Sequence, residues 1–294
     1  MDGSIGSLVS PRRMLAAASR SASRSPDHDL TLIIPALNEE RRLPRTLAAV
    51  QEALSTWRID FRVIVVDDGS VDRTAELPAQ YGHRFRAVRL PRNRGKGAAV
   101  RAGMLQATGA VAAFTDADLP FDLSALRRGY ELIRRDEADV VCGARDLAES
   151  RTNVSRSLWR HCASWAFRSA VRGLLALQVS DTQCGLKIFS RRAVEAIFPR
   201  QQVDGLAFDV EVLYLAERLG LTCTRIPVLQ LNEYASTVLL RRQALPMLME
   251  VLRIRWRGFS ASDDLATATR SRPATARPPI KLAPTAGSTA GSAA

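Results

Sequence analysis

Two aspartates one residue apart follow a short apolar run, and their spacing suggests a chemical role. The run VAAFT at 111–115 has the length of a buried strand, and Asp116 and Asp118 follow it. Side chains alternate along a strand, so positions i and i+2 point the same way. Two neighbouring carboxylates repel each other, and a divalent cation relieves that repulsion. Since Mg²⁺ and Mn²⁺ prefer carboxylates and substrate phosphates, the pair predicts a metal site that holds a diphosphate.

Two further motifs could bind a nucleotide. In VVDDGSVDRT (65–74), Asp67 and Asp68 could cap the following helix or hold a base or ribose. In LPRNRGKGAAVRAG (90–103), the glycines around Lys96 permit close backbone approach to an anionic group. Its alternative is a loop with a solvated lysine. Neither the P-loop spacing nor the dinucleotide-binding fingerprint is present.

The elements that must position these residues alternate between strand and helix. We expect strands at 30–35, 61–68, 85–91, 111–116 and 138–143, and helices at 38–54, 70–81, 95–108 and 123–135. Such alternation with near-continuous apolar strands predicts an α/β fold, a mostly parallel sheet with helices on both faces. Functional groups in such sheets gather at the carboxyl ends of strands. The polar residues expected there are Asn38, Glu39, Asp67, Asp68, Asp116 and Asp118.

The pattern changes after residue 145. We expect a long basic helix at about 155–177, a strand at 186–190, a helix at 207–220, a strand at 221–231 and a basic amphipathic segment at 238–259. The segments 158–178 and 238–259 combine tryptophan and leucine with arginines, as interfacial helices do, although core helices with snorkelling arginines remain the alternative. The domain is expected at 30–257, between disordered tails at 1–29 and 258–294.

The net charge and the residue composition limit which classes of binding partner are expected. The net charge of +12 favours anionic partners such as a nucleotide, a nucleic acid or an anionic membrane surface. No RNA-binding, zinc-finger or helix-turn-helix pattern is present, so no nucleic-acid partner is expected. Four cysteines without a C-x-x-C pair indicate reduced thiols. No stretch of roughly 20 apolar residues is present, so we expect no spanning helix.

Taken together, six motifs resemble glycosyltransferase family 2, in its dolichyl-phosphate glucosyltransferase and polyprenyl-phosphate sugar synthase branch. The motifs are IPALNEE (34–40), VVDDGSVDRT (65–74), NRGKGAAVRAG (93–103), DAD (116–118), DTQCGLKIFSRRA (181–193) and AFDVEVLYLAE (207–217). The resemblance implies a GT-A fold, a nucleotide-diphosphate sugar donor, a divalent metal (Mg²⁺ or Mn²⁺) and inversion at the anomeric carbon. It also implies a polyprenyl or dolichyl phosphate acceptor.

The resemblance also implies roles for individual residues. Those implied to bind the nucleotide sugar are Pro35, Leu37, Glu39, Asp67, Asp68, Lys96, Asp116 and Gln183, with Asp116 and Asp118 at the metal. Leu37 stands where many mannosyl members have an aromatic residue, and Pro120 where they often have a glutamine ligand. Both departures favour UDP-glucose over GDP-mannose.

The acceptor chemistry is expected to need positioning more than proton transfer. A phosphate monoester is largely ionised near neutral pH, since its second pKa is about 6. Arginines bind such phosphates bidentately. The residues expected at the acceptor phosphate are Arg145, Arg156, Arg160, Lys187 and Ser236, and those expected to be catalytic are Asp209, Arg145 and Arg156. Asp209 could contact sugar hydroxyls or act as a weak base, or could simply stabilise a helix N-terminus.

The sequence therefore predicts a glucosyltransferase attached peripherally to the cytoplasmic face of a membrane, with homo-oligomerisation possible in principle. A family 2 enzyme that uses GDP-mannose or a soluble acceptor is the first alternative. A non-catalytic protein that binds nucleotide sugars or nucleic acid is a remote one.

Overall fold

The computed structural model describes residues 26–147, 150–152, 171, 173–175, 184–231, 237–260 and 281–282. Its centre is a twisted sheet with strands β1 (His28–Ala36), β2 (Phe61–Asp67), β3 (Phe85–Arg89), β4 (Gly109–Phe114), β5 (Val140–Ala144), β7 (Lys187–Ser190) and β8 (Cys223–Pro227). They lie in the order β8-β5-β7-β4-β1-β2-β3, and the two-residue β10 (Lys281–Leu282) pairs with β8 at one edge. A second, small sheet pairs β6 (Arg151–Thr152) with β9 (Leu229–Gln230).

All neighbours in the main sheet are parallel except those of β7, which runs antiparallel to both β4 and β5. Because of this reversal, the first residue of β7, Lys187, lies opposite Phe114 at the end of β4 and Cys142 near the end of β5. The start of β7 therefore reaches the same edge of the sheet as the carboxyl ends of the parallel strands.

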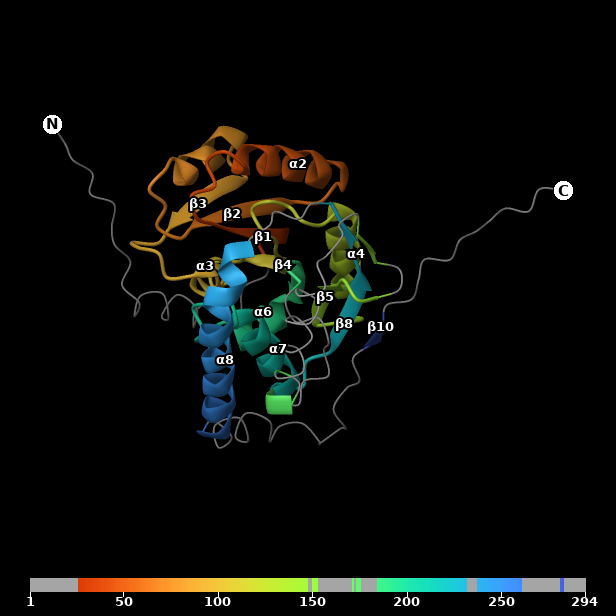
Figure 1. Cartoon of the computed structure of the whole chain (residues 1–294). Coiled ribbons are helices and arrows are strands. Elements are labelled where there is room, and N and C mark those ends of the chain that lie inside the picture. The colour runs from red at the N-terminus through yellow and green to blue at the C-terminus, as the bar shows by residue number, and fades with distance from the viewer. Residues whose placement is uncertain are drawn as a thin grey trace.

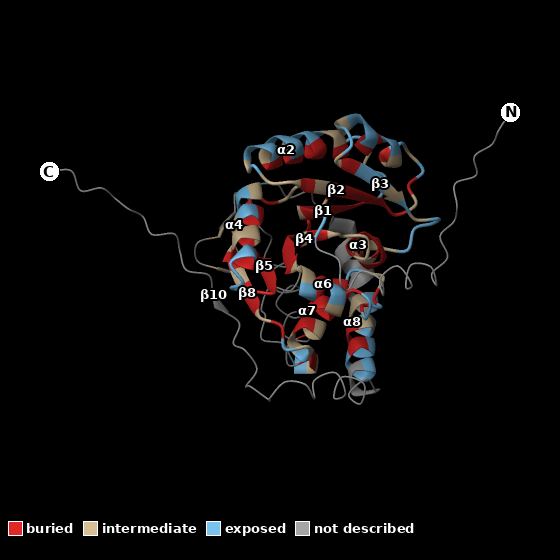
Figure 2. Cartoon of the chain, turned by 180° about the vertical axis from the view of Figure 1, so that it is seen from behind, coloured by how far each residue is buried: buried red, intermediate tan, exposed pale blue. Residues whose placement is uncertain are grey.

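Helices cover both faces of the sheet (Figure 1). Alternation along β1 separates two cores: Leu32 and Ile34 pack on one side, and Ile33 packs on the other. The first core lies under α2 (Leu43–Thr56) and α4 (Leu123–Arg134), and the second contains α3 (Lys96–Met104), α6 (Arg191–Ile197) and α7 (Phe208–Arg218). In Figure 2 the strands are largely buried while the helices expose their outer faces. The predicted α/β architecture is confirmed.

Several predicted elements differ in detail. The helix expected at 70–81 is the 3₁₀-helix η1 (Thr74–Tyr81), which contains Pro78; proline removes a backbone donor and disfavours a continuous α-helix. The helix expected from residue 38 begins only at Leu43, after Asn38 adopts a positive φ of 55°. The short α6 was not predicted; the hydroxyl of Ser190 caps it by accepting the amide N–H of Ala193 at 3.1 Å.

The C-terminal part of the domain ends in α8 (Thr237–Ser260), which packs against α7. Over its described side chains, Val251 and Ile254 are buried, whereas Met249, Leu252 and Trp256 are 49%, 41% and 76% exposed. This part of α8 is therefore amphipathic, with apolar groups also on its outer face. No helix in the described ranges is both long enough and apolar enough to cross a membrane. The predicted long helix at 155–177 falls mostly outside these ranges.

Candidate active site

A cavity of about 550 Å³ opens at the carboxyl edge of the sheet. Its walls come from the ends of β1 and β4, the loop after β2, the start of α3, the segment before α7, and α8. The lining residues are Pro35, Ala36, Leu37, Glu39, Arg42, Asp68, Asn93, Gly95, Lys96, Ala99, Asp116, Ala117, Asp118, Gly205, Leu206, Pro246, Met247 and Glu250. Seven of the residues expected from sequence at the nucleotide sugar or metal are among them: Pro35, Leu37, Glu39, Asp68, Lys96, Asp116 and Asp118.

Asp116 and Asp118 face this cavity from a turn and not from the strand itself, because β4 ends at Phe114. Lys96 Nζ lies 2.5 Å from Asp116 Oδ1. Burial raises the pKa of Asp118 above its ordinary value, and the neighbouring Asp116 carboxylate raises it further. The hydroxyl of Thr46, on α2, donates to the Ala117 carbonyl at 2.5 Å and fixes the turn between the two aspartates. The two carboxylates therefore form a crowded anionic group.

This donor set fits a hard divalent cation. A cation between Asp116 and Asp118 would relieve the repulsion that raises the pKa of Asp118. Among the described residues, no three histidine, cysteine, aspartate or glutamate side chains form a closed metal site. Asp116 and Asp118 would provide carboxylate ligands, and water and phosphate oxygens usually complete the coordination of magnesium in such sites.

Glu39 and Leu37 reach the cavity from the segment after β1. The Glu39 carboxylate pairs with Arg42, with Arg42 Nε 2.7 Å from Oε2. Burial nevertheless raises the pKa of Glu39, with the Arg42 charge opposing it. The segment is tied to the loop after β2, because the amide of Asn38 donates to Ser70 Oγ at 2.8 Å and that of Glu39 to Thr74 Oγ1 at 2.9 Å. Two predicted nucleotide-binding loops are therefore joined into one wall.

Asp67 and Asp68 are adjacent in sequence but have different environments. Asp68 lines the cavity and accepts the amide N–H groups of Arg94 and Gly95, both at 2.8 Å. Asp67 does not line it: its side chain is fully buried and accepts the amide N–H of Ser70 at 2.9 Å. Its second oxygen lies 3.2 Å from Arg89 Nε, although the two are not aligned as a hydrogen bond. Neither aspartate caps η1; both organise loops.

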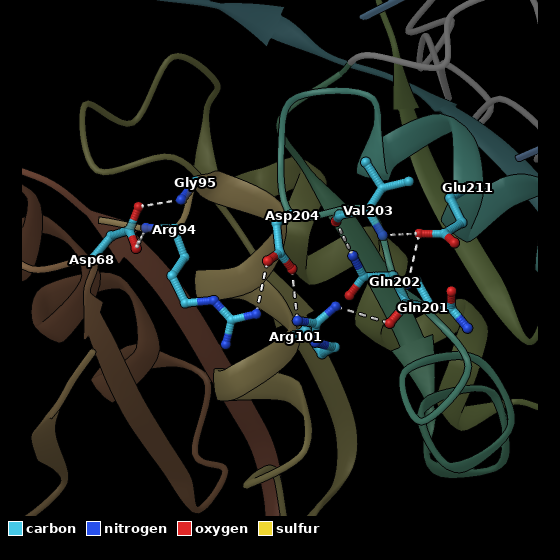
Figure 3. Close-up of polar contacts among 9 residues, drawn as sticks. All are labelled: Asp68, Arg94, Gly95, Arg101, Gln201, Gln202, Val203, Asp204 and Glu211. Atoms are coloured by element: carbon cyan, nitrogen blue, oxygen red, sulfur yellow. Dashed lines mark hydrogen bonds and ion pairs between the residues drawn. The ribbon is translucent and has the colours of Figure 1, made fainter. Parts of the chain in front are cut away.

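A polar network supports the loop at 92–96 from the far side (Figure 3). Asp204 accepts from Arg94 Nη2 at 2.8 Å and from Arg101 Nη2 at 2.7 Å. Glu211, near the start of α7, accepts the amide N–H groups of Gln202 and Val203 at 2.9 and 2.7 Å. The segment at 201–204 is therefore anchored to α3 and α7, and it holds the Arg94 loop against Asp68.

Behind the cavity, Lys187 and Asp209 form a buried ion pair. Lys187 Nζ lies 2.5 Å from Asp209 Oδ1 and donates to the Cys184 carbonyl at 2.9 Å. Burial raises the pKa of Asp209 despite the nearby Lys187 and Lys96 charges. Burial alone would lower the pKa of Lys96, but the Asp116 and Asp209 carboxylates outweigh it and the pKa is raised. Charges of alternating sign thus extend from the cavity into the core.

The structure does not bring every predicted site residue into the cavity. Lys187 and Asp209 are buried behind it, and Arg145 lies just after the end of β5, partly buried and away from the lining. The predicted site residues Arg156, Arg160, Gln183 and Ser236 lie outside the described residues. Sequence reasoning assigned no role to Arg42, Gly205, Leu206, Pro246, Met247 and Glu250. The amphipathic pattern of 238–259 was the one signal that could have indicated the last three.

The cavity lies at the carboxyl edge of the sheet, the place where open α/β sheets bind their ligands. Residues 31–198 match the family model described as glycosyl transferase family 2, and the chain belongs to that family. It is 32% identical over 242 residues to a dolichyl-phosphate beta-glucosyltransferase of Dictyostelium discoideum, covering 78% of this chain and 74% of that protein. It is 33% identical over 223 residues to the dolichyl-phosphate beta-glucosyltransferase of Homo sapiens, covering 69% and 68%.

Solved structures confirm the fold. Glucosyl-3-phosphoglycerate synthase of Mycobacterium tuberculosis in complex with UDP superposes with a TM-score of 0.55 and 18% identity, covering 84% of this chain and 86% of that one. A complex of the same enzyme with Mn²⁺, UDP-glucose and glycerol 3-phosphate gives a TM-score of 0.53 at 16% identity, covering 85% and 87%. The predicted GT-A architecture is thereby confirmed.

Proposed function

We propose that this protein transfers glucose from UDP-glucose to a polyprenyl or dolichyl phosphate with inversion at the anomeric carbon. One observation carries the proposal: the cavity gathers Asp116, Asp118 and Lys96 in a chain whose relatives are named dolichyl-phosphate beta-glucosyltransferases. The donor nucleotide would lie against Leu37, Glu39 and Asp68, because these residues form the wall built from the loops after β1 and β2.

Asp116 and Asp118 would hold Mg²⁺ or Mn²⁺. When bound, such an ion supplies positive charge next to the leaving nucleoside diphosphate. Lys96, at the start of α3, pairs with Asp116. It would give the leaving nucleoside diphosphate a second cationic neighbour beside the metal ion. Asp209 is buried and does not line the cavity. We therefore propose that Asp209, paired with Lys187, helps to keep Lys96 protonated.

The reaction needs few proton transfers. An oxygen of the acceptor phosphate forms a bond to the anomeric carbon, while the bond from that carbon to the donor diphosphate breaks and its electron pair leaves with UDP. The phosphate is already ionised near neutral pH, so positioning of two anions is the main task. Arg145 lies at the carboxyl edge after β5, and we keep it as an acceptor-phosphate residue together with Arg156, Arg160 and Ser236.

The proposal is tested by following label into lipid. Full-length protein with radiolabelled UDP-glucose, Mg²⁺ and polyprenyl phosphate in detergent micelles should yield label in the organic phase, and chelation should stop it. Matched reactions contain GDP-mannose as donor or a soluble phosphomonoester as acceptor. Transfer only from GDP-mannose would refute the donor, and transfer only to the soluble acceptor would refute the lipid.

We further propose peripheral contact with the cytoplasmic face of a membrane through α8. Its outer side presents Met249, Leu252 and Trp256 beside exposed arginines, the composition of an interfacial helix. Replacing Trp256 with alanine should reduce partitioning onto anionic lipid vesicles by about tenfold, the effect of losing roughly 1.5 kcal/mol of apolar burial. Vesicle flotation measures the partitioning.

The matched control for this experiment is Val71→Ala. Val71 is an apolar residue that is 94% exposed in the loop after β2, far in sequence from α8. This variant should float like the wild-type protein. Equal flotation of the Trp256 variant and the wild type would remove α8 from the membrane contact.

A further inference from the structure

α8 contributes one wall of the cavity, although it lies more than a hundred residues from the aspartates that follow β4. Pro246, Met247 and Glu250 line the cavity at helical spacing, and Val251 and Ile254 continue that side of the helix into the core. The inner side of α8 thus has a function distinct from its exposed outer side. Figure 1 shows α8 beside α3, which contributes Lys96 and Ala99 to the lining, and beside α7, which follows the lining residues Gly205 and Leu206.

Glu250 is held at the wall by the segment before α7. Its Oε2 accepts the amide N–H of Ala207 at 3.2 Å. Gly205 leaves the room that the carboxylate occupies, because a Cβ there would meet Oε1 first and would lie 2.9 Å from Oε2, closer than real contacts allow. Oε1 therefore packs against the Cα side of Gly205. Within the described part of the chain, the other oxygen, Oε1, makes no hydrogen bond or ion pair. One oxygen is therefore fixed, and the other is able to accept a hydrogen bond.

The surroundings define what Glu250 could bind. The lining residues nearest to it in the sequence and fold are Gly205, Leu206, Pro246 and Met247, none of which carries a charge. A carboxylate here would repel a phosphate and attract either a cation or a neutral hydrogen-bond donor, and the hexosyl group of the proposed donor offers neutral hydrogen-bond donors. Hydroxyl groups of a sugar are such donors, and hydrogen bonds to an ionised carboxylate are among the stronger ones.

We propose that Glu250 accepts a hydrogen bond from a hydroxyl group of the transferred sugar and so selects a neutral hexose. The inference rests on the proposed function, since it assumes a nucleotide-sugar donor in this cavity. Its consequence is discrimination: a donor whose sugar carries a carboxylate meets like charge at Glu250. A site built around one polar contact rejects ligands that leave the contact unpaired or repelled.

The test separates contact with the sugar from contact with the nucleotide. Calorimetry with Mn²⁺ compares UDP and UDP-glucose binding to the wild type, Glu250→Ala and Glu250→Gln. Glu250→Ala should weaken UDP-glucose binding by about tenfold or more, the typical effect of losing a hydrogen bond to a charged group, and should change UDP binding by less than about twofold. Glu250→Gln should raise kcat/KM for UDP-glucuronic acid relative to UDP-glucose.

The control is Glu195→Gln, which removes a carboxylate paired with Arg191 on the outer side of α6. It should leave the affinities for UDP and UDP-glucose unchanged. Equal weakening of UDP and UDP-glucose by Glu250→Ala would show that Glu250 contacts the nucleotide or only supports the segment at 205–207, and would overturn the inference. Unchanged binding of both would overturn it as well. Failure of the wild-type protein to bind any UDP-sugar would instead refute the proposed function, and this inference with it.

Discussion

Replacing Asp118 with asparagine should lower the rate of glycosyl transfer by at least about 10–100-fold. Mutation of a residue that merely supports a metal ligand typically reduces metal affinity or activity by this factor, and Asp118 is proposed as a ligand itself. The substitution keeps the shape of the side chain but removes one of two carboxylates that face the cavity. Stability should not fall. The pKa of Asp118 is raised in the folded protein, by burial and then by Asp116, so its charged form opposes folding near neutral pH. A neutral residue removes that cost.

Two measurements check this expectation. Calorimetry should show loss of Mn²⁺-coupled UDP binding, and thermal melting should give a midpoint equal to or above that of the wild type. Asp122→Asn serves as the matched control, because Asp122 lies four residues away, precedes α4 and does not line the cavity. If Asp118→Asn bound UDP and Mn²⁺ as tightly as the wild type, the metal role of the pair would be excluded.

Replacing Lys187 with methionine should lower the free energy of unfolding by about 3–5 kcal/mol, the usual cost of leaving one member of a buried ion pair without its partner. Lys187 is 0% exposed, and its amine contacts both the Asp209 carboxylate and the Cys184 carbonyl. Methionine has a similar volume, so the loss is mainly electrostatic. Urea unfolding at neutral pH measures it.

The double variant Lys187→Met, Asp209→Leu distinguishes electrostatics from packing. Replacing a buried ion pair by apolar residues of similar size is often neutral or stabilising, so the double variant should recover most of the lost stability. Glu195→Gln, which breaks an exposed pair with Arg191, should cost less than about 1 kcal/mol. A double variant as unstable as Lys187→Met alone would contradict this account, since the loss would then come from packing.

The parts of the site that could be predicted from sequence are those that follow a strand directly. Leu37, Glu39, Asp68, Asp116 and Asp118 come just after β1, β2 or β4, and parallel strands bring their carboxyl ends to one edge. The apolar pattern of the strands predicts which chain segments reach that edge. It does not fix which side chain of an adjacent pair turns outward, and the fully buried Asp67 shows this.

What could not be predicted depends on tertiary packing. Lysine is rarely buried completely, so no local signal placed Lys187 inside the core with Asp209. The direction of β7 was also not readable, because a short strand with three buried residues has the same pattern whether it is antiparallel or parallel. Glu250 reaches the cavity only because α8 packs on α7, a contact between segments that local patterns do not pair.

The reversed direction of β7 has an evolutionary consequence. The chain leaves the sheet after Ala144, at the end of β5, and re-enters it at Lys187, and both points belong to the edge that carries the cavity. Insertions or deletions between these anchors would leave every strand pairing of the sheet in register. Because Arg145, Arg156 and Arg160, which we propose for the acceptor phosphate, belong to this segment, we infer that acceptor preference diversifies among relatives by changes in this one segment while the sheet is retained.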